Sequence, residues 1–411
     1  MRFTFGKVCI FVLATLGPCA GCEQSSAVDG VESKEEAAVK KDPVPKNLQT
    51  LQEDWVTFPN SKSMYNLVPQ VQNQIQEFIT RRSNPVAASV VIDVATGKIL
   101  AMTQGKLPDE WGGATHTALH EGFPTASLFK TVVAAAAFEV AGVSPHEPIG
   151  LYGGCANVHP KGYWMSSTRG GRANNMDLQR AYGMSCNGFF AKLAVNRIGL
   201  GVIQDMAARF GWNGYPVKTD FQMPPSPIKI PNPRTSSVHT IGRFAAGFGS
   251  VGTSPAHMAW QMLAIARDGE AIPLRMFSDD RLTDHDPIRI IQPRTAKTIR
   301  EIMFATTHGG TASSTFRHRR YRKLREIVGG KTGTLNGHSP TGVVTWFAGM
   351  MPLDNPRVVV ASVVVLEDLW HFKASDLAAE SFLAYYDYMQ RSNNVSQLKK
   401  GESERVPLSL R

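Results

Sequence analysis

Cysteine, acidic charge and long apolar runs are all scarce in this sequence. There are five cysteines in 411 residues, and three of them, Cys9, Cys19 and Cys22, lie within the first 22 positions. Lys and Arg outnumber Asp and Glu by 44 to 34, but we find no zinc-finger spacing and no other nucleic-acid-binding motif. We therefore expect no nucleic-acid partner. The densest basic stretch, residues 317–325, is expected to be a solvated face or an edge strand protected by its charge.

The apolar run near the start of the chain is too short for a comfortable membrane span. It covers positions 8–16, follows two basic residues and precedes small residues, which is the pattern of an export signal. The stretch "CAGC", ending at Cys22, is similar to a lipoprotein processing site, although Cys19 stands where such sites usually have Leu. We expect an export signal over residues 1–22 with lipidation at Cys22. The alternatives are an uncleaved anchor and simple secretion.

Polar segments flank one large patterned region. Residues 23–64 are expected to be a tether, since positions 23–47 are rich in Ser, Glu and Lys and hold almost no large apolar residue. Residues 391–411 are expected to be a polar tail. The region between them, residues 65–390, has enough apolar residues for a sizeable core, and we find no internal repeat in it.

The hydrophobic pattern of this region predicts strands near both of its ends and helices between them. Residues 86–105 are expected to form two strands around a turn, and three more strands are expected within residues 325–367. Short connections among these late strands favour antiparallel pairing. Helical periodicity precedes the first strand pair and recurs at 253–269 and at 374–389. We therefore expect an α+β fold, with an antiparallel sheet flanked by helices and a mostly helical second lobe.

One charged residue, Lys130, interrupts the apolar or hydroxyl-bearing stretch 126–138, three positions after Ser127. At helical spacing these two side chains share a face, so the amine can reach the hydroxyl. An apolar setting disfavours the charged amine, and a neutral amine can take the proton of serine, which is otherwise a poor nucleophile. The alternative is that Lys130 reaches solvent and Ser127 only caps the helix. Ser-x-x-Lys occurs three times, but only this copy opens a long apolar helix.

Two further motifs are informative only in combination. Ser185 and Asn187, in "SCN", can relay a proton and bind a substrate amide, or they can cap a helix. The stretch "KTGT", residues 331–334, lies in an expected strand among glycines, where a ligand or another backbone comes close. Its lysine and hydroxyls suit an anionic ligand such as a carboxylate. A phosphate loop is excluded because Arg325 stands where that motif needs glycine, and the remaining alternative is an edge strand with a solvent-facing lysine.

In this order, on a helix, a loop and a strand, the motifs resemble those of the penicillin-recognising serine enzymes, most closely the transpeptidase domain of penicillin-binding proteins. The stretches "VVIDVATGKILAM", "HGGTA" and "GGKTGT…TWFAGMMP" match usual landmarks of that family, and the resemblance covers about residues 65–390. It implies a D,D-transpeptidase that acts on the D-Ala-D-Ala stem peptides of peptidoglycan and is acylated by β-lactams. It implies no metal or cofactor. The protein would then lie outside the cytoplasm, tethered to a membrane of the bacterial cell envelope by its lipid or signal anchor.

The resemblance also gives the motif residues catalytic roles. Ser127 would be the acylated nucleophile and Lys130 its base, and Ser185 would pass the proton to the leaving group. The backbone N–H groups of Ser127 and Thr334 would form the oxyanion hole. Acylation would release D-alanine, and an amine or water would then resolve the ester.

The remaining motif residues would bind substrate. Asn187 would hold the substrate backbone, and Lys331 would supply positive potential across the cleft. Thr332 and Thr334 would bind the terminal carboxylate, with Gly333 between them in the substrate-binding strand. All of these roles follow from the family resemblance, motif by motif.

The chain departs from the family pattern at Cys186, where many relatives have Asp or Ser in the middle of the second motif. The inferred roles belong to its neighbours, so we regard the change as tolerable. Cys155 and Cys186 are the two cysteines that remain after removal of the signal. In an oxidising compartment they can pair beside the site or stay as two buried thiols, and the sequence leaves both outcomes open.

Other functions are compatible with the same fold. A D,D-carboxypeptidase would use water as acceptor in place of an amine. A β-lactamase needs a device for fast deacylation, but no Glu-x-x-Leu-Asn segment follows the second motif, and Asn187 stands where another branch has Val. A β-lactam sensor needs a signalling domain or membrane helices, which we do not find, and a degenerate scaffold should have lost a motif residue. We therefore favour the transpeptidase.

Overall fold

The structure, a computed structural model, describes the chain from residue 65 to residue 403 with short gaps. The residues left undescribed within that range are 109–115, 153, 157, 167, 170–171, 174, 279–285, 339–340 and 368–371. The expected export signal, Cys22 and the tether at residues 23–64 lie outside the described residues. Every described residue belongs to one unit of the chain, Val44–Arg411. Of the helices that are described, none has the length and apolar character needed to cross a lipid bilayer.

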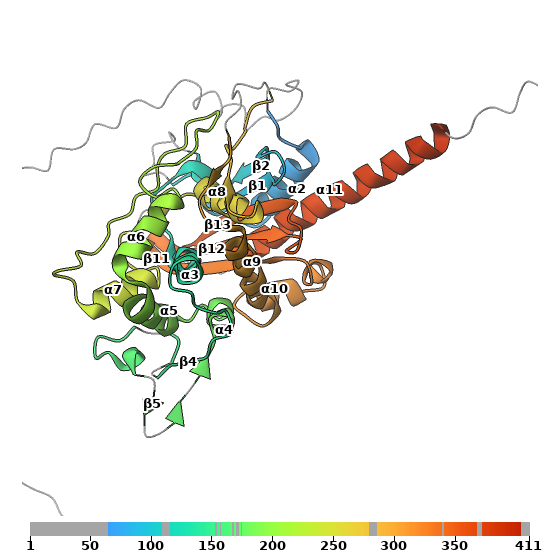
Figure 1. The fold of residues 1–411 in the computed structure, drawn as a ribbon. Coiled ribbons are helices and arrows are strands. Elements are labelled where there is room, and N and C mark those ends of the chain that lie inside the picture. Colours follow the sequence, from blue (N-terminus) through green and yellow to red (C-terminus); the bar gives the residue numbers. More distant parts are fainter. Residues whose placement is uncertain are drawn as a thin grey trace, which may run out of the picture. The chain divides into compact units, whose positions relative to one another are not determined.

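Five antiparallel strands form the main sheet, in the order β11-β12-β13-β1-β2 (Figure 1). Their bounds are β1 Ala87–Asp93, β2 Ile99–Gln104, β11 Gly329–His338, β12 Thr341–Met351 and β13 Val358–Leu366. Runs of Val and Ile favour extended backbone in β1 and β13, because branched side chains pack well on a pleated surface. Since β1 pairs with β13, early and late segments of the chain meet in one sheet, and β11 is left at its edge.

Helices cover both faces of this sheet (Figure 1). α2 (Pro69–Thr80) and α11 (Ala374–Ser403) pack on one face, and α8 (Pro255–Ala266) packs on the other. The two-residue period of a strand explains the division of the core. In β13, Val358 packs with the cluster around α2 and α11, whereas the next residue, Val359, packs with the cluster around α8.

The middle of the chain is mostly helical. Its helices are α3 Lys130–Glu139, α4 Leu178–Gly183, α5 Asn187–Leu193, α6 Leu200–Arg209, α7 Val238–Ala245, α9 Pro293–His308 and α10 Ser313–Arg317. Four short strand pairs join the loops: β3 Phe123–Pro124 with β8 Gly252–Thr253, β4 Ile149–Gly150 with β7 Asn175–Met176, β5 Thr168–Arg169 with β6 Arg172–Ala173, and β9 Glu270–Ala271 with β10 Ile288–Arg289. An antiparallel sheet with flanking helices and this helical middle confirms the expected α+β class.

The last helix is longer than expected. We expected it to end at residue 389, but α11 continues to Ser403, so the first part of the expected polar tail, residues 391–411, is helical. Apolar residues such as Phe382 anchor the start of α11 in the core. Beyond the core the sequence has no proline before the helix ends, so no residue blocks propagation of the helix from its anchored part.

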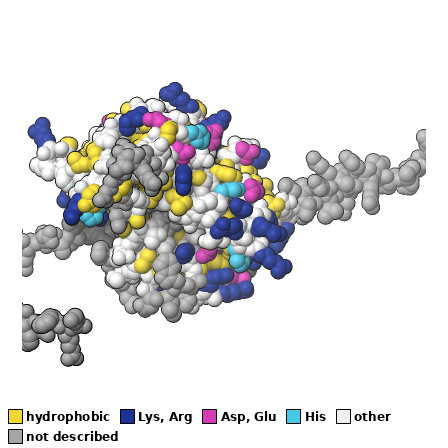
Figure 2. Space-filling model, turned by 90° about the horizontal axis from the view of Figure 1, so that it is seen from below, with side chains coloured by type: hydrophobic (Ala, Val, Ile, Leu, Met, Phe, Trp, Pro, Cys, Tyr) yellow, Lys and Arg dark blue, Asp and Glu magenta, His cyan; other side chains and the backbone are white. Residues whose placement is uncertain are grey.

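The basic stretch 317–325 is not a strand, so the edge-strand alternative is wrong. It begins at Arg317, the last residue of α10, and contains a 3-10 turn, Arg322–Leu324. Most of its Lys and Arg residues are exposed, and Figure 2 shows such side chains gathered on one part of the described surface. Two of them also bond to α11: Arg320 donates to the buried carboxylate of Glu380 at 2.6 Å, and Lys323 donates to Asp387 at 2.8 Å. This stretch is therefore a solvated face fastened to α11.

Candidate active site

The first motif forms a tight turn that leads into α3. Ala126 has a left-handed backbone, φ +51°, and begins a 3-10 turn, Ala126–Phe129, that carries Ser127. A Cβ at Gly247 would come within 1.9 Å of the Ala126 carbonyl oxygen, so only glycine fits beside the turn. The turn brings Ser127 Oγ to 2.6 Å from Lys130 Nζ. Lys130 is 0% exposed, so the alternative in which it reaches solvent is wrong.

Lys130 Nζ has three partners whose chemistry suits a neutral amine. Besides Ser127, it lies 2.8 Å from Asn187 Oδ1 and 2.7 Å from the carbonyl oxygen of Ala246. Both of these oxygens only accept hydrogen bonds, so Lys130 donates to both, and the lone pair of the neutral amine is left to face the Ser127 hydroxyl. Burial, and then the positive charge of Lys331, hold the pKa of Lys130 well below its usual value. An amine in this state can accept a proton from Ser127.

One hydrogen bond joins the second motif to the third. Ser185 lies between α4 and α5 with a left-handed backbone, φ +55°, and its Oγ accepts from Lys331 Nζ at 2.9 Å. Lys331 also donates to the carbonyl oxygen of Thr332 at 2.9 Å, and its burial lowers its pKa to about 7. Lys331 is 0% exposed, so the solvent-facing alternative is wrong. The helix-cap alternative is wrong as well, because the N-cap residue of α5 is Cys186 and no side chain caps it.

The three motifs open onto one cavity of about 270 Å³. Six of the site residues expected from the sequence line it: Ser127, Ser185, Asn187, Thr332, Gly333 and Thr334. The other two, Lys130 and Lys331, are buried and reach its two serines. The structure therefore brings all eight residues together. Among the described residues, no group of three His, Cys, Asp or Glu side chains is placed to hold a metal ion.

β11 presents its open edge to this cavity. Among the described strands it pairs with β12 alone, so alternate N–H and C=O groups along its other side have no partner strand in the sheet. This edge lies against the Ser127 turn, because a Cβ on Gly333 would be 3.3 Å from Ala126 Cβ. The indole N–H of Trp346 donates to the carbonyl oxygen of Pro124 at 2.9 Å, which fastens β12 to the segment before the turn. An extended peptide can add to an edge of this kind.

A family model for the penicillin-binding protein transpeptidase domain matches residues 87–387. The chain belongs to this family. It is 25% identical over 323 residues to penicillin-binding protein PbpB of Mycolicibacterium smegmatis, a match that covers 71% of this chain and 47% of that protein. The chain thus spans about half the length of this curated relative. Membership places the domain among serine acyltransferases and peptidases of peptidoglycan synthesis.

Solved transpeptidase structures share the fold. The D,D-transpeptidase domain of a peptidoglycan glycosyltransferase from Eggerthella lenta has a TM-score of 0.61 at 21% identity, covering 79% of this chain and 82% of that chain. The transpeptidase domain of penicillin-binding protein 3 from Burkholderia pseudomallei has a TM-score of 0.63 at 20% identity, covering 82% and 98%. Penicillin-binding protein 3 of Mycobacterium tuberculosis, solved with aztreonam, has a TM-score of 0.61 at 22% identity, covering 80% and 79%.

Among the contributors to this transpeptidase-family site that were not assigned from the sequence are Thr311 and Ala246. Thr311, in "HGGTA", lines the cavity, shares a hydroxyl–hydroxyl bond with Thr332 and donates its backbone N–H to the carbonyl oxygen of Gly183 at 3.0 Å. The landmark "HGGTA" includes Thr311, but the landmark alone gives that residue no chemical role. Ala246 contributes only its carbonyl oxygen, the acceptor for Lys130. A backbone carbonyl leaves no trace in a sequence, so no motif search could have found it.

Thr311→Val is expected to slow acylation by a penicillin about five- to tenfold, which corresponds to the loss of one hydrogen bond worth about 1 kcal/mol. Valine keeps the shape of threonine but removes the hydroxyl that orients Thr332. The measurement is the second-order rate constant of acylation by a labelled penicillin. Thr298→Val on α9 is the matched control, because within the described part of the chain the Thr298 hydroxyl bonds to its own helix, at the carbonyl oxygen of Arg294. Equal rates for the two variants would contradict a role for Thr311.

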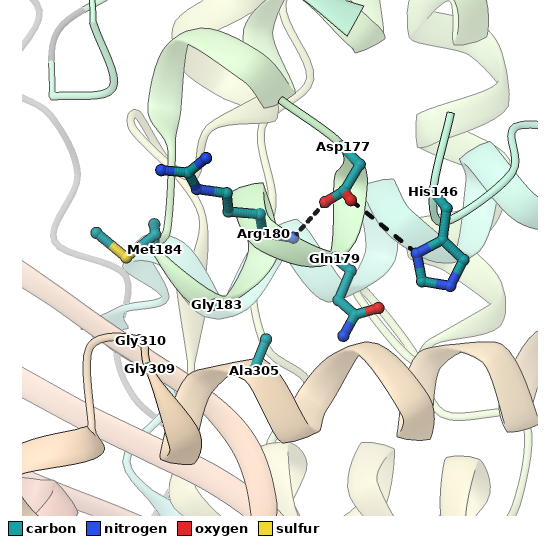
Figure 3. A pocket seen from close by; sticks show the side chains of 9 residues that line it. All are labelled: His146, Asp177, Gln179, Arg180, Gly183, Met184, Ala305, Gly309 and Gly310. Atoms are coloured by element: carbon teal, nitrogen blue, oxygen red, sulfur yellow. Dashed lines mark hydrogen bonds and ion pairs between the residues drawn. The ribbon is translucent and has the colours of Figure 1, made fainter. Parts of the chain in front are cut away.

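A larger cavity of about 600 Å³ is lined by residues of α4 and by the segment from Ala305 of α9 to Gly310 (Figure 3). Gly183 and Gly310 line it, and each is followed within two residues by a residue that lines the smaller cavity. Asp177 accepts from the backbone N–H of Arg180 at 2.8 Å and lies 4.0 Å from His146. None of the nine residues that line this cavity carries a hydroxyl or a thiol. The smaller cavity is therefore the candidate active site.

Proposed function

We propose that this protein is a serine D,D-transpeptidase that acts on the D-Ala-D-Ala stem peptides of peptidoglycan through an acyl-enzyme at Ser127. The observation that carries the proposal is the contact of 2.6 Å between Ser127 Oγ and Lys130 Nζ, inside a cavity that also holds Ser185 and the hydroxyls of β11. Peptidoglycan lies outside the cytoplasm, so the proposal also requires the export signal expected over residues 1–22.

Acylation begins with transfer of the Ser127 proton to neutral Lys130. Ser127 Oγ then attacks the carbonyl carbon of the penultimate D-alanine, and the N–H groups of Ser127 and Thr334 stabilise the oxyanion. As the C–N bond breaks, Ser185 gives its proton to the departing D-alanine amine. Lys331 restores that proton, because it is the group hydrogen-bonded to Ser185, and a pKa of about 7 makes it a competent acid at neutral pH.

Deacylation repeats these steps in the opposite direction. The acceptor amine, or water, attacks the ester and loses a proton through Ser185 to Lys331, while protonated Lys130 returns a proton to Ser127 Oγ. Atoms and charges balance over the two halves, and both lysines end in their starting states. On the side of the protein, these steps use side chains and backbone amides of this chain.

Substrate binding follows from the strand edge and its charge. The hydroxyls of Thr332 and Thr334 line the cavity together with Lys373, and buried Lys331 adds positive potential when it is protonated. A terminal carboxylate suits this end of the site. Related structures support inhibition by β-lactams: penicillin-binding protein 3 of Mycobacterium tuberculosis was solved with aztreonam and with ampicillin, and penicillin-binding protein A of the same organism as an imipenem acyl-enzyme complex.

The purified protein is expected to release D-alanine from a stem pentapeptide and, when an amine acceptor is added, to form the amide product. Mass spectrometry with and without the amine separates the candidate functions. Hydrolysis that an amine never diverts would reassign the protein as a D,D-carboxypeptidase. Rapid turnover of penicillin with no action on the peptide would make it a β-lactamase, and the absence of every product would leave a binding scaffold.

A further inference from the structure

Cys155 and Cys186 form a disulfide, which settles the question that the sequence left open. Their Cα atoms lie 4.3 Å apart, although the residues are 31 positions apart in the chain. Cys186 is buried and stands between Ser185 and Asn187, so the bond is one residue from two of the proposed site residues. The reaction steps given above make no use of this disulfide.

The segment tied down by Cys155 holds Asn187 in place. The backbone N–H of Asn187 donates to the carbonyl oxygen of Cys155 at 2.8 Å, and its side-chain Nδ2 donates to the carbonyl oxygen of Ala156 at 2.6 Å. The next residue is packed just as closely, because a Cβ on Gly188 would lie 3.0 Å from the carbonyl oxygen of Gly154. Residues 154–156 therefore fix both the backbone and the amide orientation of Asn187.

This orientation decides what Asn187 offers to Lys130. Because Nδ2 donates to Ala156, the carbonyl end of the amide, Oδ1, faces Lys130 Nζ at 2.8 Å and accepts from it. The reversed amide would point two N–H donors at the amine and would compete with Ser127 for its lone pair. The Ala156 carbonyl thus acts on the base through the amide of Asn187.

Cys155 packs partly against the core, with its Sγ 3.9 Å from Met176 Sδ. Residues 154–156 otherwise lie outside every helix and strand of the described chain, and both Gly154 and Ala156 are exposed. The disulfide is the covalent link between this segment and the loop that carries Ser185 and Asn187.

We infer that the Cys155–Cys186 disulfide is a positioning element of the active site: it holds residues 154–156 over Asn187, so that Asn187 in turn orients Lys130 toward Ser127. The inference rests on the proposed function. Reduction releases the segment, Asn187 loses two partners, and water gains access to the amine of Lys130. The chain therefore makes acyl transfer depend on oxidation of these two cysteines.

Water access predicts a change in the pH profile, because burial is the larger cause of the lowered pKa of Lys130. The charged group that faces this amine is Lys331 of β11. The other described neighbours are uncharged: the Asn187 amide and the Phe190 ring of α5 and the Ala246 carbonyl after α7. Less burial raises the pKa, so the neutral amine appears at higher pH.

The test compares acylation of the full chain by a labelled penicillin before and after reduction, with both thiols counted by alkylation. We expect the rate constant at pH 7 to fall about tenfold, the acid limb to move up by about one pH unit, and the rate to recover at high pH and on reoxidation. Cys155→Ser should behave like the reduced protein and should not respond to the reductant.

Unchanged rate and unchanged profile after complete reduction would overturn the inference. So would a loss of rate that only follows loss of the near-ultraviolet circular dichroism signal, since that would show a merely structural bond. Failure of the proposed acyl-enzyme at Ser127 gives a different result, because the oxidised wild type would then never be acylated. A carboxypeptidase or β-lactamase would still be acylated, and the peptide assay described above identifies either one.

Discussion

Ser127→Ala is expected to abolish covalent labelling by penicillin, with a loss in acylation rate of about 10⁴-fold or more, as for other serine nucleophiles removed from a catalytic unit. The variant should remain folded, because it removes one hydroxyl and leaves Lys130 with its acceptors at Asn187 and Ala246. Intact-mass spectrometry of the protein after incubation with penicillin measures the adduct, and thermal unfolding checks the fold.

Ser185→Ala is the informative comparison. Its hydroxyl is expected to relay a proton, so this variant should be acylated slowly and still carry the adduct on Ser127. Peptide mapping locates the adduct in each protein. Persistent labelling of Ser127→Ala, or an adduct at Ser185 in the wild type, would remove Ser127 from its proposed role.

Local signals in the sequence were sufficient to predict much of the fold. The helix expected at 253–269 is α8: the Ser254 side chain accepts from the backbone N–H of His257, Pro255 occupies the first turn, and Gly269 has a left-handed backbone beyond the end. Helix caps, turns and the two-residue hydrophobic period of a strand each depend on residues a few positions apart. They can therefore be recognised in a single sequence. The end of α11 had no such signal, because its last turns are set by propagation from an anchored start.

The candidate site was predictable in its residue types but not in its connections. The motifs identified Ser127, Lys130 and Lys331 as chemically useful, and the structure places them around one cavity, although their roles stay predictions. The carbonyl oxygens of Ala246 and Ala156 hold the polar network together, and every residue has such an oxygen. Only the fold selects these two, across separations of 116 and 31 positions from their partners.

Lys130→Arg should reduce acylation by about 10²–10⁴-fold, the usual contribution of a general base. Arginine can still donate to the two carbonyl oxygens, but it stays charged at all relevant pH values and offers no lone pair to Ser127. Lys192→Arg is a matched control, because Lys192 is also buried and donates to the carbonyl oxygen of Gly150 at 2.7 Å outside the cavity. The control should acylate at close to the wild-type rate.

The pH profile of Lys130→Arg distinguishes loss of the general base from a steric effect of the larger arginine side chain. In the wild type, acylation should decline as the pH falls through the lowered pKa of Lys130, because the protonated amine cannot accept the Ser127 proton. For peptide substrates with a carboxylate, kcat/KM should also decline above pH of about 7, as Lys331 loses its charge. The two lysines interact, so the limbs report the pair. Lys130→Arg should lose the acid limb and keep the alkaline one. An acid limb that survives in this variant would mean that another group takes the proton of Ser127.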